Sequence, residues 1–332
     1  MSAAPLHVLA GALRDREGRV LLAERPAGKH LAGLWEFPGG KREPGETLLA
    51  ALARELDEEL GIELVEATPL IRVPWRYRER GLLLDAWVVT RWRGEPRPLD
   101  GQGLQWRLPM QVDPATLAPA DRAILQALRL PPHCLVTPAD VPRQERDAWF
   151  GRIVGAIEAG ERLVQLRLPP WPRDAVREFA AALLPLAREH GVQLLLNADV
   201  EGALSLGVGV HLTGAQLAGL DARPLPLRQT VGASCHDAAQ LAKARQLGVD
   251  FATLSPVLAT ASHPGAMPLG WARFRTLAEA AALPVYALGG MSPAQLLQAR
   301  AAGAHGVAGI RGFWAQPQAH PVRDGSDVGS KP

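Results

Sequence analysis

The pattern of apolar and polar residues changes character near residue 130 of this 332-residue chain. Before that point, strand-like apolar runs at 6–12 and 20–23 accompany one strongly helical stretch at 48–60. After it, short apolar strands alternate with alanine-rich helical stretches. Consecutive prolines break a helix, so Pro131 and Pro132, inside the segment 130–133, suit a linker between two domains.

Eight strand candidates follow residue 130. They lie at 134–137, 163–167, 193–197, 209–212, 231–234, 251–255, 285–288 and 306–310. Helical patterns fill most of the gaps, for example at 237–247 and 293–302. Strands that alternate with helices favour a parallel sheet, and eight of them favour a closed barrel of roughly 180 residues.

The composition narrows the class of protein. With 47% apolar residues, 21% charged residues and a net charge of +2, we expect a soluble globular protein that binds neither a membrane nor a nucleic-acid polymer. Cys134 and Cys235 have no metal or disulfide spacing, which fits a reducing cytoplasm. We expect no secretory signal, because no basic region precedes the first apolar stretch. No apolar run approaches the ~20 residues that cross a membrane.

One motif dominates the first domain. The pattern G-x5-E-x7-R-E-L-x-E-E-x-G-I is filled at Gly40, Glu46, Arg54, Glu55, Leu56, Glu58, Glu59, Gly61 and Ile62. On a helix each residue turns by about 100°. We therefore predict a buried stripe and, beside it, a sector that holds the glutamates of 55–59. The stripe comprises Leu49, Leu52, Leu56 and Leu60.

The sector formed by Glu55, Glu58 and Glu59 predicts a site for a divalent cation. Like charges at these spacings repel by roughly 0.2–0.5 kcal/mol per pair, and a cation removes that cost. Mg²⁺ (or Mn²⁺) prefers oxygen ligands, few of them from protein and the rest from water and phosphates. Gly39 and Gly40 can bring a backbone carbonyl close to the metal. A solvated acidic helix face is the alternative, but it does not explain the other motif residues in register.

The motif is the Nudix box, and residues 4–130 resemble the MutT branch, whose members hydrolyse oxidised purine nucleotides. The resemblance extends to L-W-E-F-P-G-G-K at 34–41, G-E-P at 94–96, G-Q at 101–102, Trp106, and A-P-A-D at 118–121. It implies an α/β/α sandwich over residues 1–130. It also implies that water attacks a phosphorus of a nucleoside triphosphate, which yields the monophosphate and pyrophosphate.

The resemblance assigns roles residue by residue. Arg54 would orient Glu46, and Arg25 would lie near the phosphates. Asp100 stands where the branch has a metal-binding or base-like glutamate, so Glu55 or Asp100 would be the general base. An ordinary loop aspartate is the alternative for Asp100.

Phe37 and Asp121 are, with Arg25, the expected substrate-binding residues. Asp121 stands where MutT has an asparagine that reads the guanine edge. An ionised aspartate can only accept hydrogen bonds, so it could accept the N7–H of 8-oxoguanine but would repel O6 unless it were protonated. Preference for 8-oxo-dGTP is therefore a hypothesis. The alternative for Asp121 is a helix N-cap.

Residues from about 134 to 314 resemble thiamine phosphate synthase and the related thiazole tautomerase branch. The matching pieces are V-Q-L-R at 164–167, Asn197, G-V-H-L at 209–212, G-A-S-C-H at 232–236, S-P-V at 255–257, T-x-S at 260–262 and A-L-G-G-M at 287–291. They fall at the carboxyl ends of predicted strands, where barrel active sites lie. We expect a (β/α)8 barrel at 134–315 and a disordered tail at 316–332. The barrel site would comprise Arg167, Asn197, Ser234, His236, Gly290 and Gly309.

Departures from the synthase pattern argue against synthase activity. Its metal-binding aspartates have no counterpart at Ala198 or at 213–215, and two of its cations are replaced by Pro169 and His263. Without them the departure of diphosphate is hard to stabilise. His236 matches the tautomerase histidine and could move a proton, or it could merely orient a loop. Arg167 could bind a phosphate or form a surface ion pair.

Three functions stay open at this point. The chain could be a nucleotide diphosphatase with an auxiliary barrel. It could be a thiamine-pathway enzyme, acting as a thiazole phosphate tautomerase or on a thiamine diphosphate-related compound. Alternatively, the barrel could sense a thiazole or phosphate ligand and regulate the hydrolase.

Overall fold

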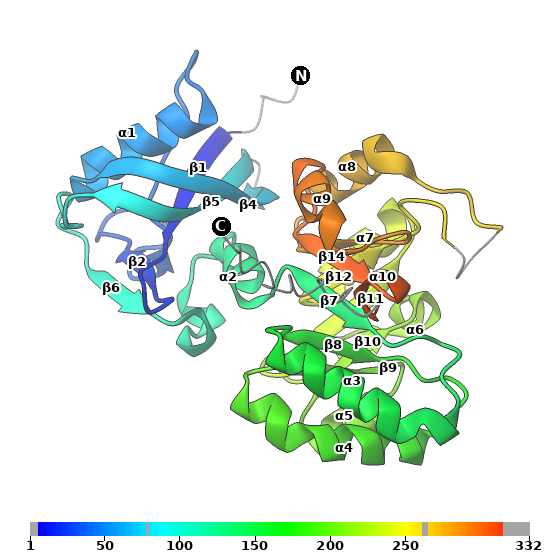
Figure 1. The fold of residues 1–332 in the computed structure, drawn as a ribbon. Coiled ribbons are helices and arrows are strands. Elements are labelled where there is room, and N and C mark those ends of the chain that lie inside the picture. The colour runs from blue at the N-terminus through cyan, green and yellow to red at the C-terminus, as the bar shows by residue number, and fades with distance from the viewer. Residues whose placement is uncertain (1–5, 78–79, 261–264, 315–332) are drawn as a thin grey trace, which may run out of the picture.

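The computed structural model describes residues 6–77, 80–260 and 265–314. Figure 1 shows a mixed α/β unit built by the first part of the chain beside a barrel built by the second. The expected disordered tail and His263 lie outside the described residues.

The first unit contains two three-stranded sheets and two long helices. The sheets have the strand orders β1-β5-β4 and β3-β2-β6. The elements are β1 (Leu6–Leu13), β2 (Val20–Glu24), β3 (Trp35–Glu36), α1 (Leu48–Leu60), β4 (Glu63–Tyr77), β5 (Arg80–Arg93), β6 (Leu104–Arg107) and α2 (Asp121–Arg129), with 3-10 turns at Pro109–Gln111 and Pro114–Thr116.

Alternate side chains of β1 contribute to the two hydrophobic cores of this unit, one on each face of the sheet. Leu9 and Leu13 pack with the buried face of α1, whereas Ala10 and Ala12 pack with the buried face of α2. Successive side chains of a strand point to opposite faces, so one strand supplies both cores. The expected α/β/α sandwich is confirmed.

Helix α1 has the predicted bounds, but one buried position was predicted wrongly. Thr47 caps its start by accepting from the Ala50 N–H, and Gly61 ends it in the left-handed region with φ 68°. Leu49 is 44% exposed, and Ala51 is buried over the first turn instead. At the first turn, Ala51 and the partly buried Leu48 pack into the core cluster in place of Leu49, so the covered face there differs from the one that uniform helical spacing predicts.

The hairpin of β4 and β5 is the longest element of the sheets, and the sequence pattern did not single it out. Its register shifts between Leu64 and Glu66, between Glu66 and Ala67, and between Pro69 and Ile71. Prolines are tolerated because β4 is the edge strand of its sheet. These bulges interrupt the alternation by which a strand is recognised in a sequence.

The second part forms a closed parallel barrel in the order β10-β11-β12-β13-β14-β7-β8-β9, as predicted. Each strand ends within one residue of its predicted bounds. The strands are β7 (His133–Val136), β8 (Leu163–Leu166), β9 (Gln193–Asn197), β10 (Gly209–Leu212), β11 (Val231–Cys235), β12 (Phe251–Leu254), β13 (Val285–Leu288) and β14 (Gly306–Gly309).

Helices surround this barrel. They are α3 (Arg146–Glu158), α4 (Arg173–Glu189), α5 (Val200–Leu206), α6 (Gly214–Gly219), α7 (Ala238–Leu247), α8 (Gly270–Ala281), α9 (Leu296–Ala301) and α10 (Arg311–Trp314), with 3-10 turns at Arg143–Glu145 and Pro293–Gln295. In the part of the chain described here, no helix combines the length and the apolar character that crossing a membrane requires.

The segment between α2 and β7 is fixed to the barrel. The carbonyls of Leu130, Pro131 and Pro132 accept, in turn, from His305 Nε2 at 3.0 Å, from the hydroxyl of Tyr286, and from the backbone N–H of Val307 at 2.9 Å. Because three successive carbonyls are bound, this connection is not a free hinge.

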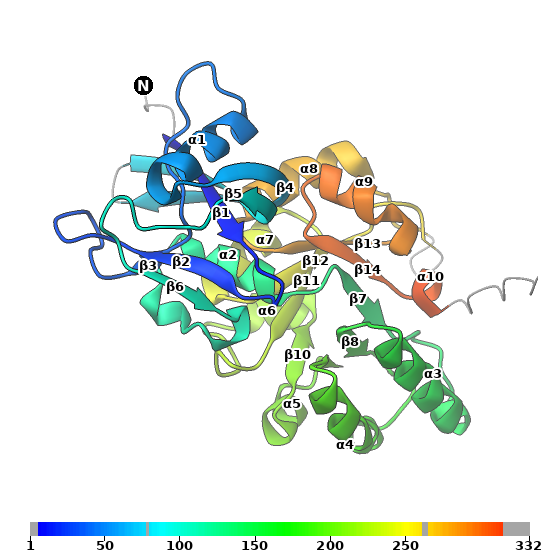
Figure 2. The same ribbon diagram turned by 60° about the vertical axis from the view of Figure 1, so that its left-hand side comes forward.

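The two units also touch through β4 and α8, which lie next to each other in Figures 1 and 2. Arg72 on β4 pairs with Glu279 on α8 at 3.5 Å, and Arg245 on α7 lies 5.6 Å from the ring centre of Trp75. Ala282, just after α8, is buried in the hydrophobic cluster that contains α2. The barrel thus completes part of the core of its neighbour.

We predict that Tyr286→Phe lowers the free energy of unfolding by about 1–2 kcal/mol, because the Pro131 carbonyl loses its buried donor. Urea denaturation measures the change. Thr276→Val, which removes an exposed hydroxyl, is the matched control and should change stability by less than about 0.5 kcal/mol. Equal effects in the two variants would contradict the role given to Tyr286.

Candidate functional site

A cavity of about 1080 Å³ lies between α1, the start of β1 and the start of α2. One end is lined by residues of the motif, namely Gly39, Gly40, Arg54, Glu55, Glu58 and Glu59. The other end is lined by Arg25, Glu36, Phe37 and Asp121. The fold therefore brings the predicted metal site and the predicted base contacts to one cavity.

The glycine pair permits close packing at the motif end. A Cβ on Gly40 would lie 2.0 Å from a carboxylate oxygen of Glu55, and one on Gly39 would lie 2.2 Å from the carbonyl oxygen of Leu9. The N–H of Gly39 donates to Glu59 Oε2 at 3.1 Å. The Gly40 carbonyl accepts from the Leu9 N–H at 2.8 Å, so it has one lone pair left for a metal.

Arg54 is the centre of the polar contacts on α1. It donates to both carboxylate oxygens of Glu46 at 2.8 and 3.2 Å, to Glu55 at 3.0 Å, to Glu58 at 3.2 Å and to the Lys41 carbonyl at 2.9 Å. The hydrogen bond with Arg54 lowers the pKa of Glu46. The same bond raises the pKa of Arg54 above its ordinary value. Sequence reasoning expected the Glu46 pair but missed the bonds to Glu55 and Glu58.

The three glutamates of α1 offer oxygen donors of the kind that Mg²⁺ or Mn²⁺ takes. Burial raises the pKa of Glu59 to about 7, and the charges of Glu36, Glu55 and Asp100 add to the rise. Such crowding of carboxylates is what a cation relieves. Among the residues that the structure describes, no three acidic, histidine or cysteine side chains form a ready-made metal cluster. Substrate phosphates and water would have to complete the coordination.

Asp121 lies at the other end of the cavity. It is buried, and its Oδ1 accepts from the N–H of Phe37 at 3.0 Å. The N-cap alternative is wrong, because Asp121 is the first residue of α2 and Ala120 stands at the cap position without a side-chain bond. Burial raises the pKa of Asp121 to about 7. The charge of Glu36 raises it further, and Arg25 opposes the rise.

Glu36 is a cavity residue that sequence reasoning missed, although it lies inside the segment 34–41 that carried the resemblance. Arg25 donates to the Glu36 carboxylate and, at 2.7 Å, to the His30 carbonyl. Burial raises the pKa of Glu36, and the charge of Arg25 opposes the rise. Arg25 is therefore held in an ion pair with Glu36 at the end of the cavity where Asp121 lies. The ring of Phe37 packs into the hydrophobic core.

Asp100 lies apart from these groups. Its carboxylate is 49% exposed, pairs with Lys29 Nζ at 3.5 Å and does not line the cavity. It is nevertheless near enough to raise the pKa of Glu59.

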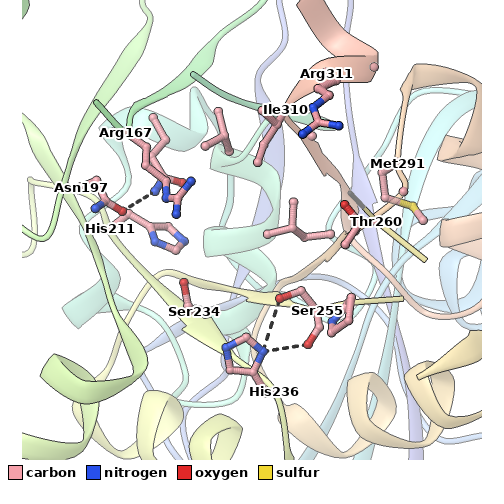
Figure 3. A pocket seen from close by; sticks show the side chains of 18 of the residues that line it. Arg167, Asn197, His211, Ser234, His236, Ser255, Thr260, Met291, Ile310 and Arg311 are labelled. Atoms are coloured by element: carbon pink, nitrogen blue, oxygen red, sulfur yellow. Dashed lines mark hydrogen bonds between the residues drawn. The ribbon is translucent and has the colours of Figure 1, made fainter. Parts of the chain in front are cut away.

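A second cavity, of about 660 Å³, lies at the carboxyl ends of the barrel strands (Figure 3). All six residues predicted for the barrel site line it, namely Arg167, Asn197, Ser234, His236, Gly290 and Gly309. Asn197 accepts from Gln165 Nε2 at 2.9 Å, so its own amide N–H groups are left to donate.

Two histidines line this cavity. His236 Nδ1 lies 2.8 Å from the carbonyl oxygen of Ser255. A carbonyl only accepts, so Nδ1 carries the proton and the neutral ring keeps a basic lone pair on Nε2. His211 is buried, and burial, followed by the charge of Arg167, lowers its pKa to about 4. Its Nδ1 is buried and has no hydrogen-bond partner among the described residues.

The loop after β9 has Ala198 at the position where the synthase pattern has a metal-binding aspartate. Ala198 has a left-handed φ of 60°, its N–H donates to the His211 carbonyl at 2.9 Å, and its carbonyl accepts from Gln216. The next residue, Asp199, does not line the cavity, because it pairs with Arg177 at 2.7 Å. No carboxylate therefore replaces the synthase metal ligand at this position.

Two family models match the two halves of the chain. A model described as "NUDIX domain" matches residues 9–127, and one described as "Thiamine monophosphate synthase" matches residues 134–313. The 8-oxo-dGTP diphosphatase of Proteus vulgaris is 43% identical over 27% of this chain and 80% of its own length. The CTP pyrophosphohydrolase of Escherichia coli is 42% identical over 35% and 86%. The thiamine-phosphate synthase of Laribacter hongkongensis is 38% identical over 46% and 74%.

We predict that Asp121→Asn stabilises the fold more at pH 8 than at pH 5. The folded pKa of about 7 lies above the ordinary 3.8, so the contribution of the protonated Asp121 is complete below pH ~4 and lost as the pH rises through 7. Asparagine does not titrate, so the gain of the variant over the parent should grow by about 1–3 kcal/mol between these pH values.

Urea unfolding at a series of pH values measures that gain. Glu36 and Arg25 face Asp121 and are unchanged in the variant. Asp147→Asn, at a side chain that is 93% exposed, is the control. Parallel pH profiles for the parent and Asp121→Asn would contradict the assignment.

Proposed function

The chain belongs to the Nudix family through its first unit and to the thiamine monophosphate synthase family through its barrel, and from this membership we propose that it hydrolyses a nucleoside triphosphate in the Nudix cavity. The products are the nucleoside monophosphate and pyrophosphate, and the first candidate substrate is 8-oxo-dGTP. One observation carries the proposal: the glutamates of α1 and the buried Asp121 line the same cavity.

The residues of α1 would carry the phosphate chemistry. Glu55, Glu58, Glu59 and the Gly40 carbonyl are the proposed ligands of Mg²⁺ or Mn²⁺, which when bound neutralises phosphate oxygens and acidifies water. Water forms a bond to phosphorus as the bond to the pyrophosphate oxygen breaks, and a carboxylate takes the proton. Glu55 is favoured over Asp100 as that base because it lines the cavity. Arg54 holds Glu46, Glu55 and Glu58 in place.

Two carboxyl groups of the cavity, those of Asp121 and Glu36, would select the nucleobase of the substrate. An ionised Asp121 can accept the N7–H of 8-oxoguanine, whereas the protonated form can also donate to O6. A protonated carboxyl also complements cytosine, because it donates to N3 and accepts from the 4-amino group. A cytidine nucleotide is therefore the second candidate, which agrees with the activity named for the Escherichia coli relative.

The barrel has a second candidate function in proton transfer. The Ser255 carbonyl fixes His236 in the form whose Nε2 is basic, which is the state a general base needs. This favours an isomerase of the thiazole phosphate tautomerase kind over a synthase. A barrel that binds ligand without turnover and regulates the hydrolase is the remaining proposal.

We predict that, with Mg²⁺ present, kcat/KM for 8-oxo-dGTP exceeds that for dGTP. Asp121→Leu should reduce the ratio by about tenfold or more, because leucine offers no hydrogen bond to the nucleobase and hydrogen bonds at a buried polar site discriminate strongly. Pyrophosphate release from 8-oxo-dGTP, dGTP, CTP and dCTP is the measurement. A higher value for CTP would replace the first candidate by the second. No turnover of any nucleotide would overturn the proposal, and thiamine diphosphate would then be assayed.

We predict that Glu58→Gln lowers kcat by about 100-fold or more while the fold stays intact, because a metal ligand is lost. Asp57→Asn, on the same helix but outside the cavity, is the matched control and should keep full activity. Circular dichroism of both variants reports the fold. Unchanged turnover in Glu58→Gln would contradict the assignment of Glu58 as a metal ligand.

A further inference from the structure

Several lysine and arginine side chains line the Nudix cavity, and the fold does not hold them equally firmly. Arg54 donates to the carboxylates of three glutamates, and Arg25 is paired with Glu36. Lys29 also lines the cavity, but its ion pair is with the exposed Asp100, at 3.5 Å from Nζ to the carboxylate. The two side chains of this pair are 55% and 49% exposed. Because an exposed pair contributes little to stability, Lys29 can exchange its partner at little cost.

Lys29 lies between the two ends of the cavity. Its charge reaches Glu36, at the end where Asp121 lies, and opposes the rise in the pKa of that carboxyl. Its partner Asp100 follows Leu99, whose N–H donates to the carbonyl of Glu59 at the end of α1. In a nucleotide, the sugar and the first phosphate separate the base from the outer phosphates. Lys29 therefore stands beside the part of the cavity that the first phosphate would occupy.

The backbone at Asp100 is fixed to the end of α1 by a buried side chain. Gln102 accepts from the Asp100 N–H with Oε1 at 2.9 Å and donates through Nε2 to the Glu59 carbonyl, also at 2.9 Å. The G-Q pair at 101–102 has no part in the chemistry proposed above. The structure gives its glutamine a task, which is to hold Asp100 where its carboxylate meets Lys29.

The loop that carries Lys29 is closed at its base. The Arg25 N–H donates to the Leu34 carbonyl at 2.9 Å, and the Gly33 N–H donates to the Arg25 carbonyl at 3.0 Å. The Lys29 N–H donates to the Pro26 carbonyl at 3.2 Å within the loop. A lysine ammonium sits on a long flexible stem, so it can turn from a carboxylate to a phosphate while the loop backbone stays in place.

We propose that Lys29 binds the phosphate next to the sugar of the nucleotide, and that Asp100 holds Lys29 in the free protein and releases it to the substrate. Asp100 and the substrate thus compete for one cation. The inference rests on the proposed binding of a nucleoside triphosphate in this cavity and adds to it a residue outside the Nudix box. It also differs from the roles that the resemblance implies, which place Arg25 near the phosphates and make Asp100 a metal ligand or base.

The test is calorimetric titration of the full chain, with Mg²⁺ present, with the α,β-methylene analogues of dGTP and dCTP. These compounds cannot be cleaved between the first two phosphates, so binding is measured without turnover. The analogue that the parent binds more tightly is then used with each variant. Lys29→Gln should weaken its binding by about 10-fold or more, because a charged contact to phosphate is lost.

Asp100→Asn should have the opposite effect. We expect it to tighten binding of the analogue by about threefold or more, because Lys29 no longer has to leave a carboxylate. In the Lys29→Gln background the same substitution should change binding by less than about twofold, because the two residues act through one contact. Lys243→Gln, on α7 and outside the cavity, makes the same chemical change as Lys29→Gln and should bind as the parent does.

Three outcomes would overturn the proposal. They are parent-like binding in Lys29→Gln, weaker binding in Asp100→Asn, and an equal gain from Asp100→Asn with and without Lys29. Thermal unfolding of each variant without ligand separates lost binding from lost fold. A parent that binds neither analogue would overturn the proposed function and this inference together. A parent that binds an analogue as tightly as Lys29→Gln does would overturn this inference alone.

Discussion

The first cavity depends on the close packing of the backbone of Gly39 and Gly40 against β1. Three backbone bonds join 38–42 to β1: Gly11 N–H to the Pro38 carbonyl, Leu9 N–H to the Gly40 carbonyl, and Arg42 N–H to the His7 carbonyl, at 2.8 to 3.0 Å. Any side chain at Gly39 or Gly40 would collide with β1 or with Glu55. Because the loop can lie this close, the glutamates of α1 and the backbone face one cavity.

The two cavities solve opposite electrostatic problems. The Nudix cavity gathers carboxylates whose mutual repulsion a cation would relieve, and Arg54 donates to two of them, Glu55 and Glu58. Among the described residues, the barrel cavity is lined by two arginines, Arg167 and Arg311, and by no carboxylate.

The two units are joined by hydrogen bonds and buried apolar contacts as well as by the linker. The carbonyls of 130–132 are held by His305, Tyr286 and Val307, and Ala282 enters the core beside α2. The barrel therefore supports the side of the sandwich from which Asp121 projects. This gives a physical reason for the two units to be stable together, whether or not their ligands influence each other.

The regular elements and the local motif could be predicted from the amino-acid pattern. Helix α1 and the eight barrel strands could be predicted because their apolar spacing repeats over a whole element, and the glutamates because their spacing on one helix fixes their common face. Leu49, the cap role of Asp121 and the bulged hairpin of β4 and β5 could not be predicted in this way. The packing of the first turn of α1, a contact across 84 residues and register shifts decide them, and none leaves a periodic signal. The folded chain, and not the spacing of residues, brings Glu36 beside Asp121 and Arg167 and Arg311 to one cavity, because these neighbours are distant in the sequence.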